Sequence, residues 1–205
     1  MPRRERRAKQ LAERKARKKA AVRAPAPPSP TGRPPAGVTE QYAWMAGLLG
    51  AGRGRVLEVG AEARGTAALE ARGWRVVEVE AGEVLASGGF TGEPVDAVTC
   101  WLLDLRAAKP AVVEKLHAMG LRTPEEHRLA VQTLIYRLAD RVLRPLGVLQ
   151  VVERTQEPFG QSLAAGMVRL QRAQSRGTSL EFASLDAQPV GAGALVSVLS
   201  RKGGA

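Results

Sequence analysis

The chain has 205 residues, enough for one domain with a sizeable core, and its 4% aromatic content means that aliphatic side chains form that core. A single cysteine, Cys100, excludes an internal disulfide and is typical of a reducing compartment. No apolar run approaches the roughly 20 residues of a membrane span, and the charged N-terminus is unlike a signal peptide. We therefore predict a cytoplasmic protein without a membrane partner.

The formal charge of +11 is concentrated at the N-terminus. Residues 1–23 hold eleven Lys or Arg against two Glu, whereas the rest of the chain has 20 basic and 18 acidic residues. This stretch lacks an apolar stripe, so we predict a basic disordered arm. Its expected partner is RNA or the ribosome, bound through phosphates, and the alternative is a solubilising tail.

Residues 24–37 contain six prolines and are predicted to be a semi-extended linker. The folded domain is expected to span residues 38–205. Thr39 is a suitable N-cap for a helix over residues 40–49. Apolar residues recur in that helix at helical spacing, namely Tyr42, Met45, Ala46 and Leu49.

Residues 55–80, RVLEVGAEARGTAALEARGWRVVEVE, predict a buried strand, a glycine turn, a short helix and a second strand. Glu58 lies within the first strand, and Gly60 follows it. Glu80 stands at the end of the second strand. Open α/β sheets bind ligands at the carboxyl edge of their strands, so this glycine and these acids are candidate site residues.

Four segments together are similar to a known family: LEVG at 57–60, Glu80, VDAVTCW at 95–101 and LRPLGVL at 143–149. They resemble motifs I, II and IV, and the turn before the fifth strand, of class I S-adenosylmethionine-dependent methyltransferases. The resemblance covers residues 39–202. It implies a three-layer, Rossmann-like α/β fold whose mainly parallel sheet has an antiparallel last strand. It also implies S-adenosylmethionine as the cofactor.

The resemblance implies a set of cofactor-binding residues: Glu58, Gly60, Gly65, Glu80, Cys100 and Trp101. The family's first loop usually reads acid-x-Gly-x-Gly-x-Gly, whereas Glu62 and Arg64 stand at the later glycine positions here, unless Gly65 closes a longer loop. If Glu62 has a positive φ, the strain is about 1–3 kcal/mol, and Glu62→Gly is expected to tighten cofactor binding. A nicotinamide cofactor would also use Glu80 at the end of the second strand, but the G-x-G-x-x-G pattern that such a cofactor requires is absent. The remaining alternative is a plain α/β core with a glycine turn.

Only fourteen residues, 81–94, separate the second strand from the next clear one. A helical turn over residues 83–86 and the following glycines leave little room for the family's third strand. We expect that strand to be reduced to the neighbourhood of Phe90 or to be missing.

The next strand is predicted over residues 95–103, and the methyl acceptor is expected at its carboxyl end. Two residues there are weak catalytic candidates: Asp104 as a general base and Cys100 as a nucleophile. A small buried hydrophobe is the more common role for such a cysteine. His117 and His127 are expected on the surface, and no metal site can be assembled from them.

The remaining pattern predicts helices over residues 110–119, 124–143 and 160–174, and strands over residues 148–153, 179–185 and 194–200. Thr123 and Glu126 form a capping box at the start of the second of these helices. The last two strands are expected to pair antiparallel, as they do in the family. Arg169, Arg172 and Arg176 are expected on the exposed side of the third helix.

These observations lead to three hypotheses about function. The first is methyl transfer from S-adenosylmethionine to an acceptor, with ribosomal or transfer RNA favoured by the basic arm. The second is a catalytically inactive methyltransferase-like domain that binds RNA or the ribosome. The third is a small-molecule methyltransferase.

Overall fold

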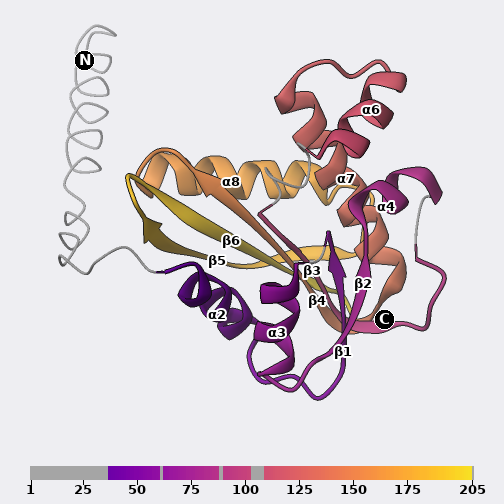
Figure 1. Ribbon diagram of the computed structural model, residues 1–205, viewed down its shortest axis with the longest axis vertical. Coiled ribbons are helices and arrows are strands. Elements are labelled where there is room, and N and C mark those ends of the chain that lie inside the picture. Colours follow the sequence, from indigo (N-terminus) through magenta and orange to yellow (C-terminus); the bar gives the residue numbers. More distant parts are fainter. Residues whose placement is uncertain (1–36, 61, 88–89, 103–108, 205) are drawn as a thin grey trace, which may run out of the picture. The chain divides into compact units, whose positions relative to one another are not determined.

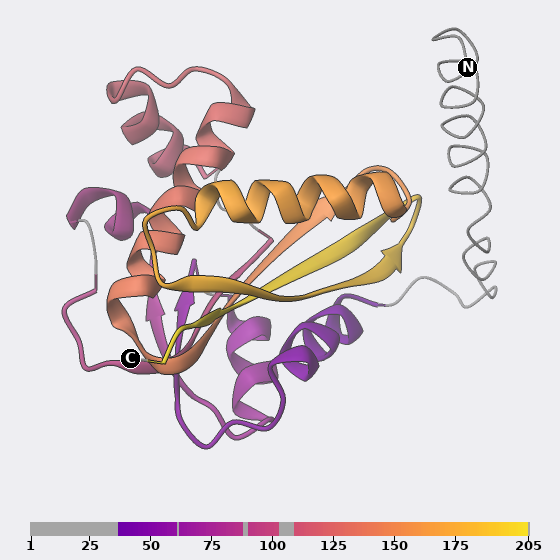
Figure 2. The same ribbon diagram turned by 180° about the vertical axis from the view of Figure 1, so that it is seen from behind.

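We analysed a computed structural model of the chain, which describes residues 37–60, 62–87, 90–102 and 109–204. The predicted arm and nearly all of the predicted linker lie outside these residues, so both remain predictions. The described part is an α/β domain in which helices cover both faces of one sheet (Figures 1 and 2). None of the described helices combines the length and the apolar character that a membrane span requires.

The sheet has six strands in the order β2-β1-β3-β4-β6-β5. Their bounds are β1 (Arg55–Val59), β2 (Arg75–Val79), β3 (Val95–Trp101), β4 (Leu143–Thr155), β5 (Leu180–Val190) and β6 (Gly193–Lys202). The first four are parallel to one another, and β6 pairs antiparallel with both β4 and β5. This topology confirms the predicted fold class, including the antiparallel last strand.

Two helices, α2 (Val38–Leu49) and α3 (Ala63–Glu70), cover one face of the sheet, and the other helices lie on the opposite side (Figures 1 and 2). These others are α4 (Ala81–Ser87), α6 (Pro110–Ala118), α7 (Pro124–Val142) and α8 (Gln161–Gln174). The aliphatic β1 is buried between both layers, whereas β2 is an edge strand with exposed positions. The segment that the sequence singled out therefore starts on a well-buried strand inside the sheet.

The α2 layer is fixed by a buried polar network around Gln150 of β4. Its amide nitrogen donates to the Met45 carbonyl and to the Ser197 hydroxyl, both at 3.0 Å. Its amide oxygen accepts a hydrogen bond from Trp101 Nε1 at 2.8 Å. Buried polar groups are costly unless they are paired, so these contacts hold α2 in one position on the sheet.

Two local expectations need correction, and a third is confirmed. The N-cap of α2 is Gly37, because the helix begins at Val38 and not after Thr39. Strand β4 begins at Leu143, since Leu143 already pairs with Val95 before the irregular step to residue 148. The capping box of Thr123 and Glu126 on α7 is confirmed, with the Glu126 amide donating to the Thr123 hydroxyl at 3.2 Å.

The described residues contain no strand between β2 and β3, which agrees with the expected loss of the family's third strand. Helix α4 begins directly after Glu80, because the amides of Glu83 and Val84 donate to the Glu80 carbonyl at 2.9 and 3.2 Å. The chain thus turns into α4 at the carboxyl edge itself, beside the end of β1.

Candidate functional site

The turn after β1 has the backbone that a glycine permits. Gly60 has φ +74°, and its amide donates to the Val79 carbonyl of β2 at 2.7 Å. An L-residue rarely adopts this conformation, so a side chain here would strain the turn. Gly60 is itself buried, and it closes β1 against the end of the adjacent parallel strand β2.

Glu58 lies behind this turn and is only 2% exposed. One of its carboxylate oxygens lies 3.1 Å from the Thr66 hydroxyl, in the first turn of α3. A Cβ atom on Gly65 would lie 2.4 Å from the other oxygen, so only glycine fits between α3 and this carboxylate. Gly65 thus belongs to α3 and does not close a longer loop, which corrects that expectation.

The expectation of a strained Glu62 is wrong. Glu62 has φ −130° and ψ 141°, an ordinary extended conformation, and it is the N-cap residue of α3. Its carboxylate accepts a hydrogen bond from the Tyr42 hydroxyl of α2. The steric argument for a glycine at this position therefore fails, and Glu62 instead ties the loop to the neighbouring helix.

Trp101, at the end of β3, packs near Tyr42 on the α2 side of the sheet. Its ring centroid is 6.0 Å from that of Tyr42, and its side chain is 1% exposed. Cys100 is fully buried and belongs to the core on the α7 side of the sheet. The structure thus gives Cys100 the surroundings of a small hydrophobe, not the accessible polar setting of a nucleophile. Asp104 lies outside the described residues.

Glu80 differs from the residues around Glu58, because its side chain is 57% exposed. One of its carboxylate oxygens accepts a hydrogen bond from Lys109 Nζ at 2.9 Å. An exposed carboxylate at this edge can also accept hydrogen bonds from the hydroxyl groups of a ligand. The structure thus brings Gly60, Glu58 and Glu80 together at adjacent strand ends, as the motifs predicted.

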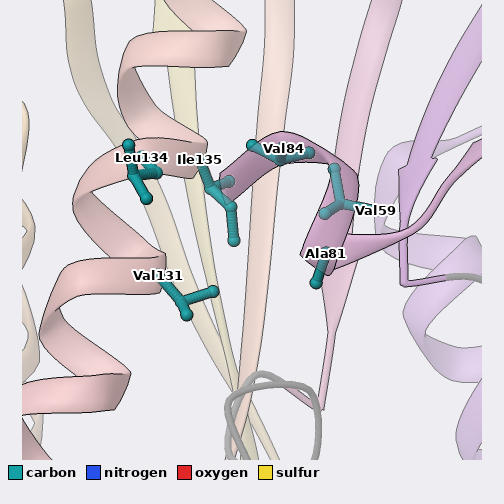
Figure 3. Close-up of a pocket in the computed structure, with 6 residues that line it drawn as sticks. All are labelled: Val59, Ala81, Val84, Val131, Leu134 and Ile135. Carbon is teal, nitrogen blue, oxygen red and sulfur yellow. The ribbon is translucent and has the colours of Figure 1, made fainter. Parts of the chain in front are cut away.

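A small apolar pocket lies beside these strand ends, between β1, α4 and α7 (Figure 3). Six aliphatic residues line it: Val59, Ala81, Val84, Val131, Leu134 and Ile135. It is too narrow to hold a water molecule. Helix α4 therefore packs close to α7 at this point and leaves an apolar wall next to Gly60 and Glu80.

The two histidines do not form a metal site. His117 is exposed, but His127 is buried, and its Nε2 lies 3.2 Å from the Leu121 carbonyl. The prediction of a surface position for His127 was therefore wrong, because the turn before α7 folds back over its ring. Within the described residues, no group of three or more metal-binding side chains comes together.

Sequence reasoning missed two side-chain partners at this edge. Lys109 follows Glu80 by 29 positions and precedes a different helix, so no local pattern links the two residues. Tyr42 was expected only to pack on the sheet, yet its hydroxyl contacts Glu62. The one available signal was a polar-tipped aromatic residue on the buried face of its helix, since a buried tyrosine hydroxyl usually finds a partner.

Comparisons with known proteins found no matching family model and no matching curated protein. Several solved structures are similar. A Thermotoga maritima S-adenosylmethionine-dependent methyltransferase, described as a possible histamine N-methyltransferase, is 15% identical over 80% of this chain and 88% of its own, with a TM-score of 0.43. A TehB-like S-adenosylmethionine-dependent methyltransferase from Corynebacterium glutamicum is 13% identical over 97% and 99%, with a TM-score of 0.44. A putative hemolysin from Streptococcus thermophilus is 10% identical over 84% and 70%, with a TM-score of 0.49.

With TM-scores below 0.5 these likenesses carry no argument, and the fold class follows from the strand order itself. Four parallel strands, an antiparallel last strand and helices on both faces reproduce the architecture that the sequence motifs implied. The chain thus has the Rossmann-like α/β topology that its resemblance to class I S-adenosylmethionine-dependent methyltransferases implied, without the third strand in its described part.

Proposed function

We propose that this chain transfers a methyl group from S-adenosylmethionine to an RNA acceptor. One observation carries the cofactor part of the proposal: Gly60 at φ +74°, the buried Glu58 and the exposed Glu80 meet at the ends of β1 and β2. This edge of an open α/β sheet is where the fold places ligands.

Each residue has a physical role in this proposal. Glu80 accepts hydrogen bonds from the ribose hydroxyls, since a carboxylate offers several acceptor positions. Gly60 lets the main chain approach the methionine part of the cofactor. Glu58 does not need to touch the ligand, because its contact with Thr66 fixes the start of α3 behind the loop. When bound, the cofactor supplies an electrophilic methyl group on a sulfonium sulfur.

The chain's main task in such a transfer is positioning, because direct displacement at the methyl carbon requires the acceptor to lie in line with the leaving sulfur. Leu102, just after β3, has φ +55° and is 5% exposed. A non-glycine residue in this conformation carries about 1–2 kcal/mol of strain, of a kind that collects at functional sites. This supports the end of β3 as the place where the acceptor approaches.

The basic arm supports RNA as the acceptor. Eleven basic residues in positions 1–23 can neutralise phosphates without reading a sequence. The described chain begins at Gly37, next to α2, and Tyr42 of this helix reaches Glu62 at the carboxyl edge. From Val38 to Tyr42 the helix rises about 6 Å, so the first described residues lie close to the proposed site.

A second candidate function is an RNA-binding domain without methyl transfer. One observation favours it: Tyr42 and Glu62 bridge the loop in which the family usually has glycines, as would be expected of a domain that kept the fold and lost its cofactor.

Calorimetric titration of S-adenosylmethionine into the full chain distinguishes the two candidates. Methyl transfer requires saturable binding, followed by incorporation of labelled methyl groups from the cofactor into RNA. Binding of RNA without any heat from the cofactor would support the inactive domain and overturn the enzyme.

A further inference from the structure

Helix α8 and the turn after it carry three exposed arginines and no acidic residue. Arg169 and Arg172 are three residues apart on one side of the helix, Arg176 follows in the turn after it, and all three are exposed. The opposite side of α8 is buried: Met167 packs on β6, and Gln171 donates to the Ser200 hydroxyl at 3.1 Å. The sheet therefore fixes α8 with its arginines directed toward solvent.

Helix α7 adds a fourth exposed arginine to the same surface. Thr133 of α7 contacts Gln174 at the end of α8, and Asp140 of α7 accepts a hydrogen bond from the Ser179 amide at 2.9 Å. Arg137 lies between these two contacts along α7 and is exposed, which places it beside the turn that follows α8. We call Arg137, Arg169, Arg172 and Arg176 the α8 arginine surface.

The positive charge of this surface is not neutralised within the described residues. None of its four arginines has a carboxylate within ion-pair distance in that part of the chain. The sequence has no acid between Glu157 and Glu181. The nearby Asp140 directs one carboxylate oxygen to both the amide and the hydroxyl of Ser179.

The composition of the surface fits a phosphate backbone better than a protein partner. Guanidinium groups bind phosphate oxygens through two parallel hydrogen bonds. Protein interfaces usually have an apolar centre, but the large exposed hydrophobic residues of the described chain, Val38, Met119 and Leu146, all lie outside α7 and α8. From Arg169 to Arg172 the helix rises about 4.5 Å, and Arg176 adds a third guanidinium group in the turn that follows.

We infer that the α8 arginine surface binds the phosphate backbone of RNA, separately from the basic arm. Helix α8 follows β4 in the chain, and its arginines lie in its C-terminal half and in the turn after it. This inference rests on the RNA acceptor proposed above, but it requires neither cofactor binding nor methyl transfer.

The test uses the full chain and a fluorescein-labelled single-stranded RNA, with affinity measured by anisotropy at several salt concentrations. The variant is R169Q/R172Q/R176Q. The matched control is R53Q/R72Q/R75Q, which removes the same charge from exposed arginines around the starts of β1 and β2. Because each lost phosphate contact on single-stranded RNA lowers the slope of log K against log salt by about 0.7, the variant should lose about 2 units of slope.

The control should keep nearly the wild-type slope, and both proteins should keep the wild-type thermal midpoint, since all six arginines are exposed. Equal slopes in the variant and the control would overturn the inference and leave the arm as the RNA-binding element. S-adenosylmethionine titrations of the same proteins separate this result from the proposed function. The wild-type chain could bind no cofactor while the variant loses part of the slope of log K for RNA against log salt. That pair of results would refute methyl transfer and still support RNA binding by the α8 arginine surface.

Discussion

The ends of β1 and β2 lie side by side at the carboxyl edge of the sheet, yet their surroundings differ. Around β1, the carboxylates form hydrogen bonds within the protein. Glu58 is buried against Thr66 and Gly65, and Glu62 accepts a hydrogen bond from the Tyr42 hydroxyl. At the end of β2, Glu80 is 57% exposed, with Lys109 on one oxygen. Substitutions at the first position should thus change folding stability, and those at the second should change ligand affinity.

The largest effect on stability is expected from Gly65→Ala. The new methyl group would lie 2.4 Å from a buried carboxylate oxygen of Glu58, so Glu58 or α3 must move. Overpacking of this kind costs about 1–3 kcal/mol of the free energy of unfolding, which urea denaturation measures. Gly166→Ala in α8 is the control: its Cβ meets nothing within 4 Å, and it should stabilise the protein by about 0.4–1 kcal/mol. Equal effects of the two substitutions would contradict the packed arrangement around β1.

A smaller loss of folding stability is expected from Glu62→Gly. The gain in cofactor affinity that the family's glycine pattern suggested is no longer expected. The substitution removes the hydrogen bond from Tyr42 and relieves no strain, because φ is −130°. The free energy of unfolding should fall by about 0.5–1.5 kcal/mol. Tyr42→Phe, which keeps the ring, should cause a similar loss, and the double variant should lose less than the sum of the two. Tighter cofactor binding by Glu62→Gly would show that the loop is strained after all.

The smallest effect on stability is expected from deleting residues 1–36, which leaves the Gly37 cap of α2 in place. The thermal midpoint should stay within about 1 °C, because the arm has no apolar stripe to bury. The dependence of RNA affinity on salt should become weaker, because fewer phosphates are neutralised. An unchanged salt slope with an intact fold would mean that the arm does not contact RNA.

The order of the elements and the position of Gly60, Glu58 and Glu80 were predictable because they depend on local patterns. Aliphatic runs mark the buried strands, glycine marks the turn, and parallel strands bring their carboxyl ends to one edge. The short 81–94 segment likewise indicated the missing third strand, since too few residues remained for a helix and a strand.

The side-chain environment was not predictable in the same way, because it depends on residues that are distant in sequence. Gly65 was assigned to a loop, whereas its actual constraint is the Glu58 carboxylate across the first turn of α3. The φ of Glu62 was inferred from the family's glycine positions, but α3 begins earlier here and gives this residue an extended N-cap conformation. The burial of His127 likewise depends on the turn at Leu121, which no helical periodicity reveals.

The most direct test of this account is the affinity for S-adenosylmethionine of the wild-type chain, Glu80→Ala and Glu70→Ala, measured by calorimetric titration. Glu70 is an exposed acid at the end of α3, so its removal changes the net charge equally and leaves the carboxyl edge intact. The Glu80→Ala variant should bind S-adenosylmethionine about 1.5–3 kcal/mol more weakly than the wild type, because hydrogen bonds to a charged acceptor are lost. The Glu70→Ala variant should bind with the wild-type affinity. Binding by the wild type with unchanged affinity in a folded Glu80→Ala would contradict the assignment of the cofactor site to this edge.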